Sequence, residues 1–447
     1  MSDYRARHLP RQLGVAAWNA ILPPRRAGPA LARDATADVV IVGAGFAGLA
    51  AARRLRQIDP GARVVLLEAG AIAEGAAGRN SGFMIDLPHD LASENYAGGG
   101  GDDRAMIAMN RAAQGFAADA VDDCGIDPNY FDRAGKVNGA ASASAHARNL
   151  GYAAHLDSLG EASEMLDAQQ MREMTGSGHY VSGLYTPGTV MLQPAGLVRG
   201  LAGGLARAGV EIFEGTPVTG FARSGSGWEV RTPAARLSAG RVVLTVNGHL
   251  ESFGVARGRL MQLFLFATMT GALDPDALDR LGGRPRWGIT PSDPMGTTMR
   301  RIDGGQGGNR IVTRTCAVLR SGMGARAPDL DRARRVMRQK FDQRFPGLSG
   351  VAMEHAWAGH LCLSRNGVAV AGEVEQGVFS GCVQNGLGTA RGVLTGIAAA
   401  EAACGVRSDI GAHFAAQSAP TRLPPRPIRD IGANAVLRWK EWRARAE

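Results

Sequence analysis

The sequence predicts a mixed α/β fold of two interleaved domains, and three observations near its start support this prediction. An apolar, β-branched run from Val39 to Val42 precedes a GxGxxG motif. The segment 49–58, which is rich in Ala, Leu and Arg, follows the motif, and a second apolar run ends at Glu68. Buried parallel strands are continuous apolar runs, and the order strand, glycine turn, helix, strand is that of a Rossmann-like unit. We therefore expect a dinucleotide-binding domain.

The three glycines of the motif have separate roles in such a unit. Gly43 allows the sharp turn, Gly45 lets the backbone approach a pyrophosphate, and Gly48 lets helix and strand pack closely. The helix N-terminus supplies free N–H groups and the positive end of its dipole. Glu68 lies 20 residues after Gly48, where a carboxylate can accept hydrogen bonds from ribose hydroxyls.

A loop of small residues, 70–82, follows the second predicted strand and ends in Gly-Arg-Asn-Ser-Gly. Arg79 and Asn80 are suited to donate hydrogen bonds to ribityl or flavin oxygens. With this loop the chain resembles the D-amino acid oxidase superfamily of FAD-dependent oxidoreductases. The loop is most similar to the GRNGG loop of the gamma-glutamylputrescine oxidase group. The resemblance implies FAD, which we expect to be bound noncovalently.

The resemblance continues along nearly the whole chain. Similar segments are 188–205, 216–218, 242–248, Trp357-Ala358-Gly359 through Gly372, 385–389 and 423–445. It implies cofactor contacts from Gly43, Ala44, Gly45, Phe46, Ala47, Gly48, Glu68, Ala69, Arg79, Asn80, Ser81, Gly82, Val218, Asn247, Gly248, Gly386, Leu387, Gly388 and Thr389.

The last of these motifs also has a physical rationale. A reduced flavin carries negative charge near N1 and the C2 oxygen, and a helix N-terminus stabilises such charge. The residues 386–389 open the apolar helix predicted over 390–403 and can present their N–H groups there. Gly392 and Gly396 lie on one face of that helix, and we interpret them as packing residues.

The predicted layout is interleaved. Residues 36–95, 185–250 and 351–410 form the FAD-binding domain, and 96–184 and 251–350 form a substrate domain with a mixed or antiparallel sheet. Residues 1–35 are an N-terminal extension, and 411–447 are a C-terminal tail helix. Within the substrate domain we expect helices over 102–123, 140–159, 161–174 and 327–345, and strands over 259–270 and 310–319.

Composition narrows the functional classes. The net charge of +9 includes no basic run, so nucleic acid is not an expected partner. The five cysteines form no CxxC pair, and the histidines show no metal-ligand spacing, so we expect reduced thiols and no metal. No segment has the ~20 apolar residues needed to span a bilayer. We therefore expect a cytoplasmic enzyme.

The end of the chain combines aromatic and basic residues. Trp439 and Trp442 lie among Arg438, Lys440, Arg443 and Arg445. Such a helix can lie at a membrane interface. We interpret it instead as a helix that docks on its own domain.

The expected reaction is oxidation of the C–N bond of a primary or secondary amine, by hydride transfer to flavin N5. The imine product hydrolyses to an aldehyde or keto compound. The amino acid oxidising branch of the family has a carboxylate-binding arginine shortly after the WxG motif, and here Leu361 occupies that position. An amino acid or N-methyl amino acid oxidoreductase, of the D-amino acid or glycine/sarcosine type, is the first alternative. It would need Arg365, Arg300 or Arg314 to replace the missing arginine. A noncatalytic FAD-binding subunit is the second alternative.

Few residues are candidates for substrate contacts. His89, His249 and Asp86 are polar and close to the segments expected to face the flavin, and each is equally compatible with a structural role. Cys362 lies near the position where some family members link FAD covalently, and we interpret it as a core residue. Lys136 is a candidate for the lysine that some members place beside the flavin. The electron acceptor, oxygen or an electron-transfer partner, and the oligomeric state are not predicted.

Overall fold

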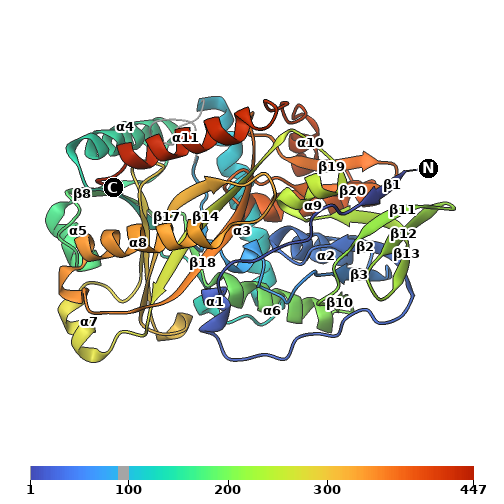
Figure 1. Ribbon diagram of the computed structural model, residues 1–447, viewed down its shortest axis with the longest axis horizontal. Coiled ribbons are helices and arrows are strands. Elements are labelled where there is room, and N and C mark those ends of the chain that lie inside the picture. The colour runs from blue at the N-terminus through green and yellow to red at the C-terminus, as the bar shows by residue number, and fades with distance from the viewer. Residues whose placement is uncertain (1, 89–99) are drawn as a thin grey trace.

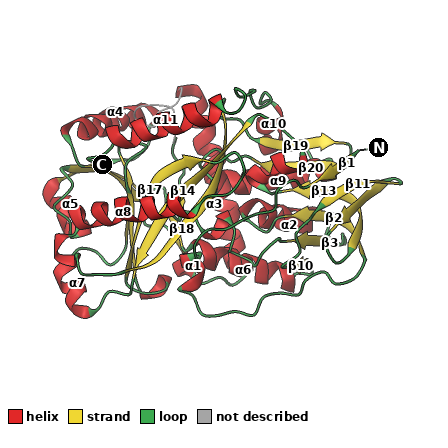
Figure 2. Ribbon diagram, in the orientation of Figure 1, coloured by secondary structure: helices red, strands yellow, loops and turns green. Residues whose placement is uncertain are grey.

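The computed structural model describes residues 2–88 and 100–447, and it confirms the predicted mixed α/β class. Figure 1 shows two regions side by side, one around the strands β2, β3 and β13, and one around β14, β17 and β18. Each region is built on its own sheet, and helices pack around both sheets (Figure 2).

The first sheet has nine strands within the described residues. Its parallel core follows the order β10-β3-β2-β13-β20, and β11, β12, β1 and β19 extend it in antiparallel pairings. The strands are β1 (Asp3–Arg5), β2 (Ala35–Val42), β3 (Val64–Leu67), β10 (Glu211–Phe213), β11 (Gly220–Ser224), β12 (Gly227–Arg231), β13 (Arg236–Leu244), β19 (Val370–Glu375) and β20 (Val378–Cys382).

Helices pack on one face of this sheet, and residues of its own strands β11 and β12 pack with the residues of the other face. Val39 and Ile41 of β2 pack with helices α2 (Phe46–Ile58), α6 (Pro194–Arg207) and α9 (Ala390–Cys404). The alternate residues Val40 and Val42 pack in a second core cluster with residues of β11 and β12. Because β2 is buried on both faces, its sequence is the continuous apolar run that identified it.

The second sheet has eight described strands in the order β18-β14-β17-β16-β15-β6-β8-β7. They are β6 (Lys136–Ala140), β7 (Glu164–Asp167), β8 (Ser182–Thr186), β14 (Leu260–Thr270), β15 (Trp287–Pro291), β16 (Thr298–Ile302), β17 (Arg310–Leu319) and β18 (Met353–Ser364). Helix α8 (Ala327–Arg344) packs on β14 and β17 through Met337 and Leu330. Helices α4 (Ala143–Leu159), α5 (Ala168–Thr175) and α7 (Pro275–Leu281) complete this region.

The remaining elements lie outside the two large sheets. Strands β4 (Phe83–Met84), β5 (Phe131–Asp132) and β9 (Val190–Leu192) form a small sheet. The other helices are α1 (Ala17–Ala20), α3 (Gly100–Asp123), α10 (Asp409–Ala415) and α11 (Ile428–Arg443). No helix among the described residues is long and apolar enough to cross a membrane.

The structure corrects several boundaries. The helix expected over 161–174 is instead β7 followed by α5, because Asp167 caps α5 and the preceding residues pair with β8. Strand β18, assigned by sequence to the FAD-binding domain, pairs with β14 along its length and belongs to the substrate sheet. The N-terminal extension is not separate, since β1 pairs with β11. The tail contains two helices, α10 and α11, rather than one.

Candidate active site

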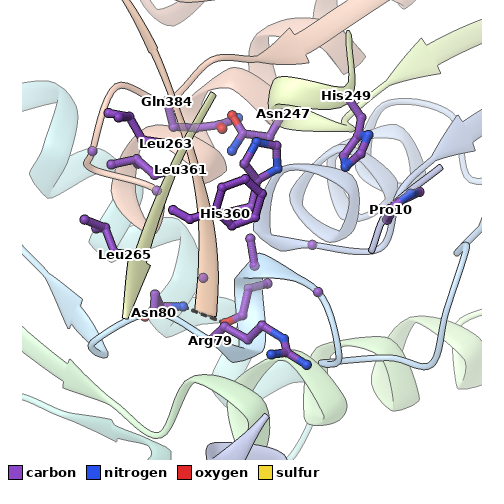
Figure 3. A pocket seen from close by; sticks show the side chains of 18 of the residues that line it. Pro10, Arg79, Asn80, Asn247, His249, Leu263, Leu265, His360, Leu361 and Gln384 are labelled. Carbon is purple, nitrogen blue, oxygen red and sulfur yellow. Dashed lines mark hydrogen bonds between the residues drawn. The ribbon is translucent and has the colours of Figure 1, made fainter. Parts of the chain in front are cut away.

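One cavity of about 660 Å³ extends between the two sheets. Its lining comes from the glycine motif, the loop 75–81, the start of α9, the strands β14, β17 and β18, the N-terminal segment 8–12 and helix α11. Figure 3 shows Arg79 and Asn80 at one edge, with the leucines of the substrate sheet and two histidines further along.

The glycine turn forms the first end of the cavity. Gly43 has a φ of +102°, and a Cβ there would lie 2.9 Å from the Thr245 carbonyl oxygen. A Cβ on Gly48 would lie 1.8 Å from the Gly43 oxygen, so Gly48 has the predicted packing role. A Cβ on Gly45 would lie 3.6 Å from the Ala77 side chain. Gly45 is the N-cap residue of α2, it has no side chain to cap the helix, and it lines the cavity. The free N–H groups of α2 therefore open toward the cavity.

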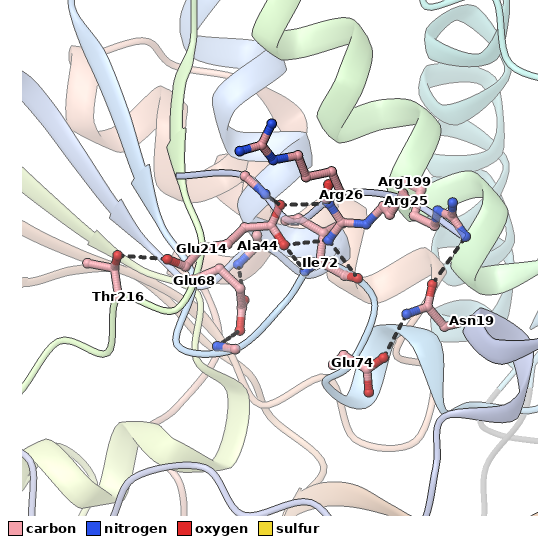
Figure 4. A network of polar contacts seen from close by, with 12 residues as sticks. Asn19, Arg25, Arg26, Ala44, Glu68, Ile72, Glu74, Arg199, Glu214 and Thr216 are labelled. Carbon is pink, nitrogen blue, oxygen red and sulfur yellow. Dashed lines mark hydrogen bonds and ion pairs between the residues drawn. The ribbon is translucent and has the colours of Figure 1, made fainter. Parts of the chain in front are cut away.

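Glu68 is held beside this turn by the backbone (Figure 4). Its carboxylate accepts hydrogen bonds from the N–H groups of Ala44 at 2.9 Å and Gly70 at 3.0 Å. Burial raises the pKa of Glu68 above its ordinary value. Behind it, Glu214 accepts from Arg25 and from the N–H of Ile72, which ties the N-terminal extension to the same end of the cavity.

The Arg-Asn loop takes its shape from its own side chains. Arg79 donates to the carbonyl oxygens of Glu74 at 2.6 Å, Leu13 at 3.2 Å and Ala358 at 3.3 Å. The Asn80 amide donates to Ala77 and accepts from the Gly82 N–H. Both residues line the cavity, but these contacts direct their side chains to the protein. The expected hydrogen bonds from these side chains to the flavin remain a prediction.

The start of α9 forms another wall. Gly386, Leu387, Gly388 and Thr389 all line the cavity, and α9 has no side-chain cap. A Cβ on Gly388 would meet no atom within 4 Å, so the space there is open. Gly396, by contrast, would place a Cβ 2.2 Å from the Ala47 oxygen of α2, as expected of a packing residue.

The substrate sheet supplies an apolar wall with few charges. Leu263, Leu265 and Leu361 project from β14 and β18 toward one side of the cavity (Figure 3). Arg314 of β17 also lines the cavity, opposite Ala267 and Thr298 in the sheet register, and Lys440 of α11 lines it as well. Leu361 thus places an apolar side chain on the wall at the position where the amino acid oxidising branch has its carboxylate-binding arginine.

Two neutral histidines lie beside this wall. The rings of His249 and His360 are 5.3 Å apart, and His360 Nε2 lies 2.9 Å from the Gln262 side-chain oxygen. Burial lowers the pKa of His249 to about 4 and that of His360 to about 3. His249 Nδ1 and Asn247 Oδ1 are buried and have no hydrogen-bond partner among the described residues, and both residues line the cavity.

A buried lysine lies behind the cavity wall. Lys136 donates to Asn138 and, at 3.3 Å, to Thr290, and Thr290 lines the cavity. Burial lowers the pKa of Lys136 to about 8. Asp86, a sequence candidate for substrate contact, is turned away from the cavity and pairs with Arg111 at 3.1 Å.

The structure brings most of the predicted cofactor residues to one cavity. Those that line it are Gly43, Ala44, Gly45, Phe46, Ala47, Glu68, Ala69, Arg79, Asn80, Ser81, Val218, Asn247 and the residues 386–389. Gly48, Gly82 and Gly248 lie behind the lining, where a Cβ would strike neighbouring groups.

Several substrate candidates lie elsewhere. Arg365 is exposed in the turn after β18, because the strand ends at Ser364. Arg300 is buried and donates to the carbonyls of Gly82 and Leu192, so it shapes the loop rather than the cavity. Cys362 packs in a core cluster with Cys382, outside the cavity lining. His89 lies outside the described residues.

Sequence reasoning missed three parts of the lining. The N-terminal segment His8–Gln12 carries no motif, and it reaches the cavity only because β1 pairs with β11. The wall leucines of β14 are one face of an apolar strand, and only the pairing with β18 shows which face is inside. Helix α11 contributes Val436 and Leu437 from the far end of the chain.

These features fit a flavin dinucleotide. Two helix N-termini without side-chain caps and the carboxylate of Glu68 lie at one cavity between the two sheets. A sequence profile of the family described as FAD dependent oxidoreductase, DAO, matches residues 38–403. The chain therefore belongs to this family of FAD-dependent oxidoreductases.

Particular relatives agree with this assignment. The chain is 25% identical to a probable oxidoreductase, OrdL, of Rhizobium meliloti over 388 residues, which is 82% of each chain. It is 23% identical to gamma-glutamylputrescine oxidoreductase of Escherichia coli over 77% of this chain and 78% of the relative. The fold matches glycine oxidase from Geobacillus kaustophilus with a TM-score of 0.70 and 18% identity, over 87% of this chain and all of that one. L-amino acid deaminase from Proteus myxofaciens matches with a TM-score of 0.67 and 15% identity, over 93% of this chain and 98% of that one.

Proposed function

We propose that this protein oxidises the carbon–nitrogen bond of a primary or secondary amine, with noncovalently bound FAD. The observation that carries the proposal is the cavity in which the N-termini of α2 and α9 lie across from the leucine wall of the substrate sheet. The likeness to gamma-glutamylputrescine oxidoreductase supports an amine as the donor.

The residues of the cavity suit this chemistry. When bound, FAD supplies the two-electron acceptor for a hydride from the carbon beside the nitrogen. The imine product is hydrolysed by water, and oxygen or an electron-transfer partner takes the electrons. The leucines Leu263, Leu265 and Leu361 exclude water and hold the apolar part of the substrate.

Arg314 supports a second candidate. A guanidinium on the cavity wall can pair with a carboxylate, and this would make the substrate an amino acid or N-methyl amino acid. The solved structures of glycine oxidase and L-amino acid deaminase share this fold. In that case Arg314 of β17 would replace the arginine that is absent at Leu361.

An anaerobic titration of the flavin absorbance distinguishes the candidates. We expect alkylamines or polyamines to bleach the flavin, and Arg314→Met to change their KM by less than about threefold, because no carboxylate is lost. Arg365→Met, at an exposed turn, is the matched control. If only amino acids bleach the flavin, and Arg314→Met raises their KM by about 100-fold, the second candidate is correct. A yellow protein that neither class bleaches would indicate a noncatalytic subunit or another donor.

A further inference from the structure

Helix α11 docks on the protein with its polar side chains. Asn434 accepts from the Leu319 N–H at 3.0 Å, and Glu441 accepts from the Ala317 N–H at 2.9 Å. Asp430 accepts from the Ser321 hydroxyl at 2.6 Å. These three residues are spaced by four and seven, so they share one face of the helix.

The edge of β17 explains this polar contact. The pairing of β17 with β16 ends at Arg314, which pairs with Thr298. Beyond it, the backbone of β17 has lost its β16 neighbour, and α11 satisfies the N–H groups of Ala317 and Leu319 with side chains. Docking on β17 therefore explains the polar residues on the inner face of α11. It does not explain apolar residues on the exposed face of the helix.

The outer face of α11 is apolar and aromatic. Its side chains Ile428, Ile431, Trp439 and Trp442 are 67%, 69%, 51% and 60% exposed. Their spacing of three, eight and three places them along one side of the helix, roughly 130° from the docking face. We call these four residues the outer ridge. Exposed aromatic and aliphatic residues on one helix face indicate a binding surface.

The charge around the outer ridge has one sign. Residues 421–447 contain seven arginines and lysines and three acids. Asp430 and Glu441 lie at the docking face, and Glu447 accepts from Ser142 at 2.9 Å. Arg426 and Arg429 donate to Ser321, and Arg438 pairs with Glu441, so the bases beside the outer ridge are Arg443 and Arg445. The guanidinium of Arg443 lies 5.0 Å from the Trp439 ring, and that of Arg445 lies 4.6 Å from the Trp442 ring. The outer side of α11 is therefore apolar with a basic border.

We propose that α11 docks on the surface of an anionic lipid membrane, with the outer ridge inserted among the headgroups. This inference goes beyond the proposed function. A helix with Trp and Ile on one side and a basic border is complementary to such a surface, where it lies in the interface without spanning it. The other sides of α11 still face the protein: Asn434 and Glu441 contact β17, and Leu437 and Lys440 line the cavity. Docking would thus place the membrane beside that wall.

Vesicle binding tests the proposal on the FAD-loaded protein. We expect co-sedimentation with vesicles of phosphatidylcholine and phosphatidylglycerol, weak binding to phosphatidylcholine alone, and release by high salt. The double variant Trp439→Ser, Trp442→Ser should lower the partition constant between water and vesicles by at least about tenfold. Leu150→Ser is the matched control, because Leu150 is 48% exposed on α4. Neither tryptophan lines the cavity, so amine oxidation without vesicles should not change.

Two further measurements separate insertion from general charge attraction. The chain has six tryptophans, and Trp18, Trp228, Trp287 and Trp357 are at most 3% exposed. Quenching of the fluorescence by brominated lipids therefore reports on the outer ridge. Arg443→Glu with Arg445→Glu should weaken binding more than Arg172→Glu with Arg284→Glu, which make the same change in net charge at two exposed positions away from α11.

Several outcomes would overturn the proposal. Absence of binding to anionic vesicles, equal effects of the two arginine pairs, or unquenched tryptophans would each contradict it. If the native protein is a dimer in solution and the tryptophan variant is a monomer, a second copy of the chain occupies the outer ridge instead. Flavin bleaching by amines is independent of all these results, so failure here leaves the proposed function standing.

Discussion

The glycine-rich end of the cavity presents backbone groups, whereas the sheet end presents side chains. At the first end, the turns at 43–48 and 386–389 open helix N-termini to the cavity. At the second, Leu263, Leu361 and Arg314 come from three strands that are far apart in the sequence. Backbone N–H groups are present whatever side chain a residue carries, while side chains can change singly. A substitution at the sheet end therefore changes the lining of the cavity more directly than one at the glycine-rich end.

The largest effect is expected where the backbone is most tightly packed. In Gly48→Ala the new Cβ would lie 1.8 Å from the Gly43 oxygen, which forces α2 away from the turn. We expect loss of flavin and destabilisation by at least about 4 kcal/mol. Flavin content and chemical denaturation measure both effects. Gly115→Ala is the control, because a Cβ at this exposed position of α3 meets no atom within 4 Å. A stable Gly48→Ala protein that keeps its flavin would contradict the view that tight backbone packing shapes this end of the cavity.

An intermediate effect is expected for Glu68, an acidic side chain that lines the glycine-rich end of the cavity. Glu68→Gln keeps the size of the side chain but removes the charge that we expect a ribose to contact. The affinity for FAD should fall about 10- to 100-fold, the range for a hydrogen bond to a charged group. Flavin titration of the apoprotein measures it. Glu211→Gln, on the neighbouring strand β10 with an exposed side chain, should bind FAD normally. Equal affinities for the two variants would show that Glu68 does not contact the cofactor.

The smallest effect is expected at the sheet end and depends on pH. The folded protein keeps His360 neutral down to about pH 3, whereas the unfolded chain takes up a proton near pH 6.5. The unfolded state therefore binds more protons below pH 6.5, and stability falls as the pH is lowered toward 3. Between pH 7 and 5.5, this one group should cost about 1 kcal/mol.

His360→Asn tests that assignment. Removing the imidazole should flatten the dependence of the unfolding free energy on pH, even if the variant is less stable at pH 7. Urea denaturation of the FAD-loaded protein at pH 7 and 5.5 provides the measurement. Parallel curves for the wild-type and variant proteins would mean that His360 is not the group that titrates, and attention would move to His249, whose pKa burial lowers to about 4.

The two ends also differed in how far the sequence predicted them. Gly43, Gly45, Glu68 and the start of α9 all line the one cavity, and each belongs to a short motif whose geometry is local, while their contacts with a cofactor stay a prediction. Arg365 was a poor candidate for the cavity, since the strand before it ends one residue earlier and leaves it in an exposed turn. The pairing of β18 with β14 was not predicted, for a similar reason. An apolar run predicts a strand but does not select the sheet that it joins.

The sequence by itself therefore determined the mixed α/β class, the glycine motifs and the helical nature of the C-terminal segment. Glycine spacing, apolar runs and capping residues act over a few residues, so they can be interpreted without tertiary contacts. Only the tertiary structure decided that β14 and β18 pair, that Arg314 faces the cavity, and that α11 turns its polar side inward. Those outcomes depend on contacts between residues 40 to more than 100 positions apart, where strand register and unpaired edges, rather than local preference, select the face that is buried.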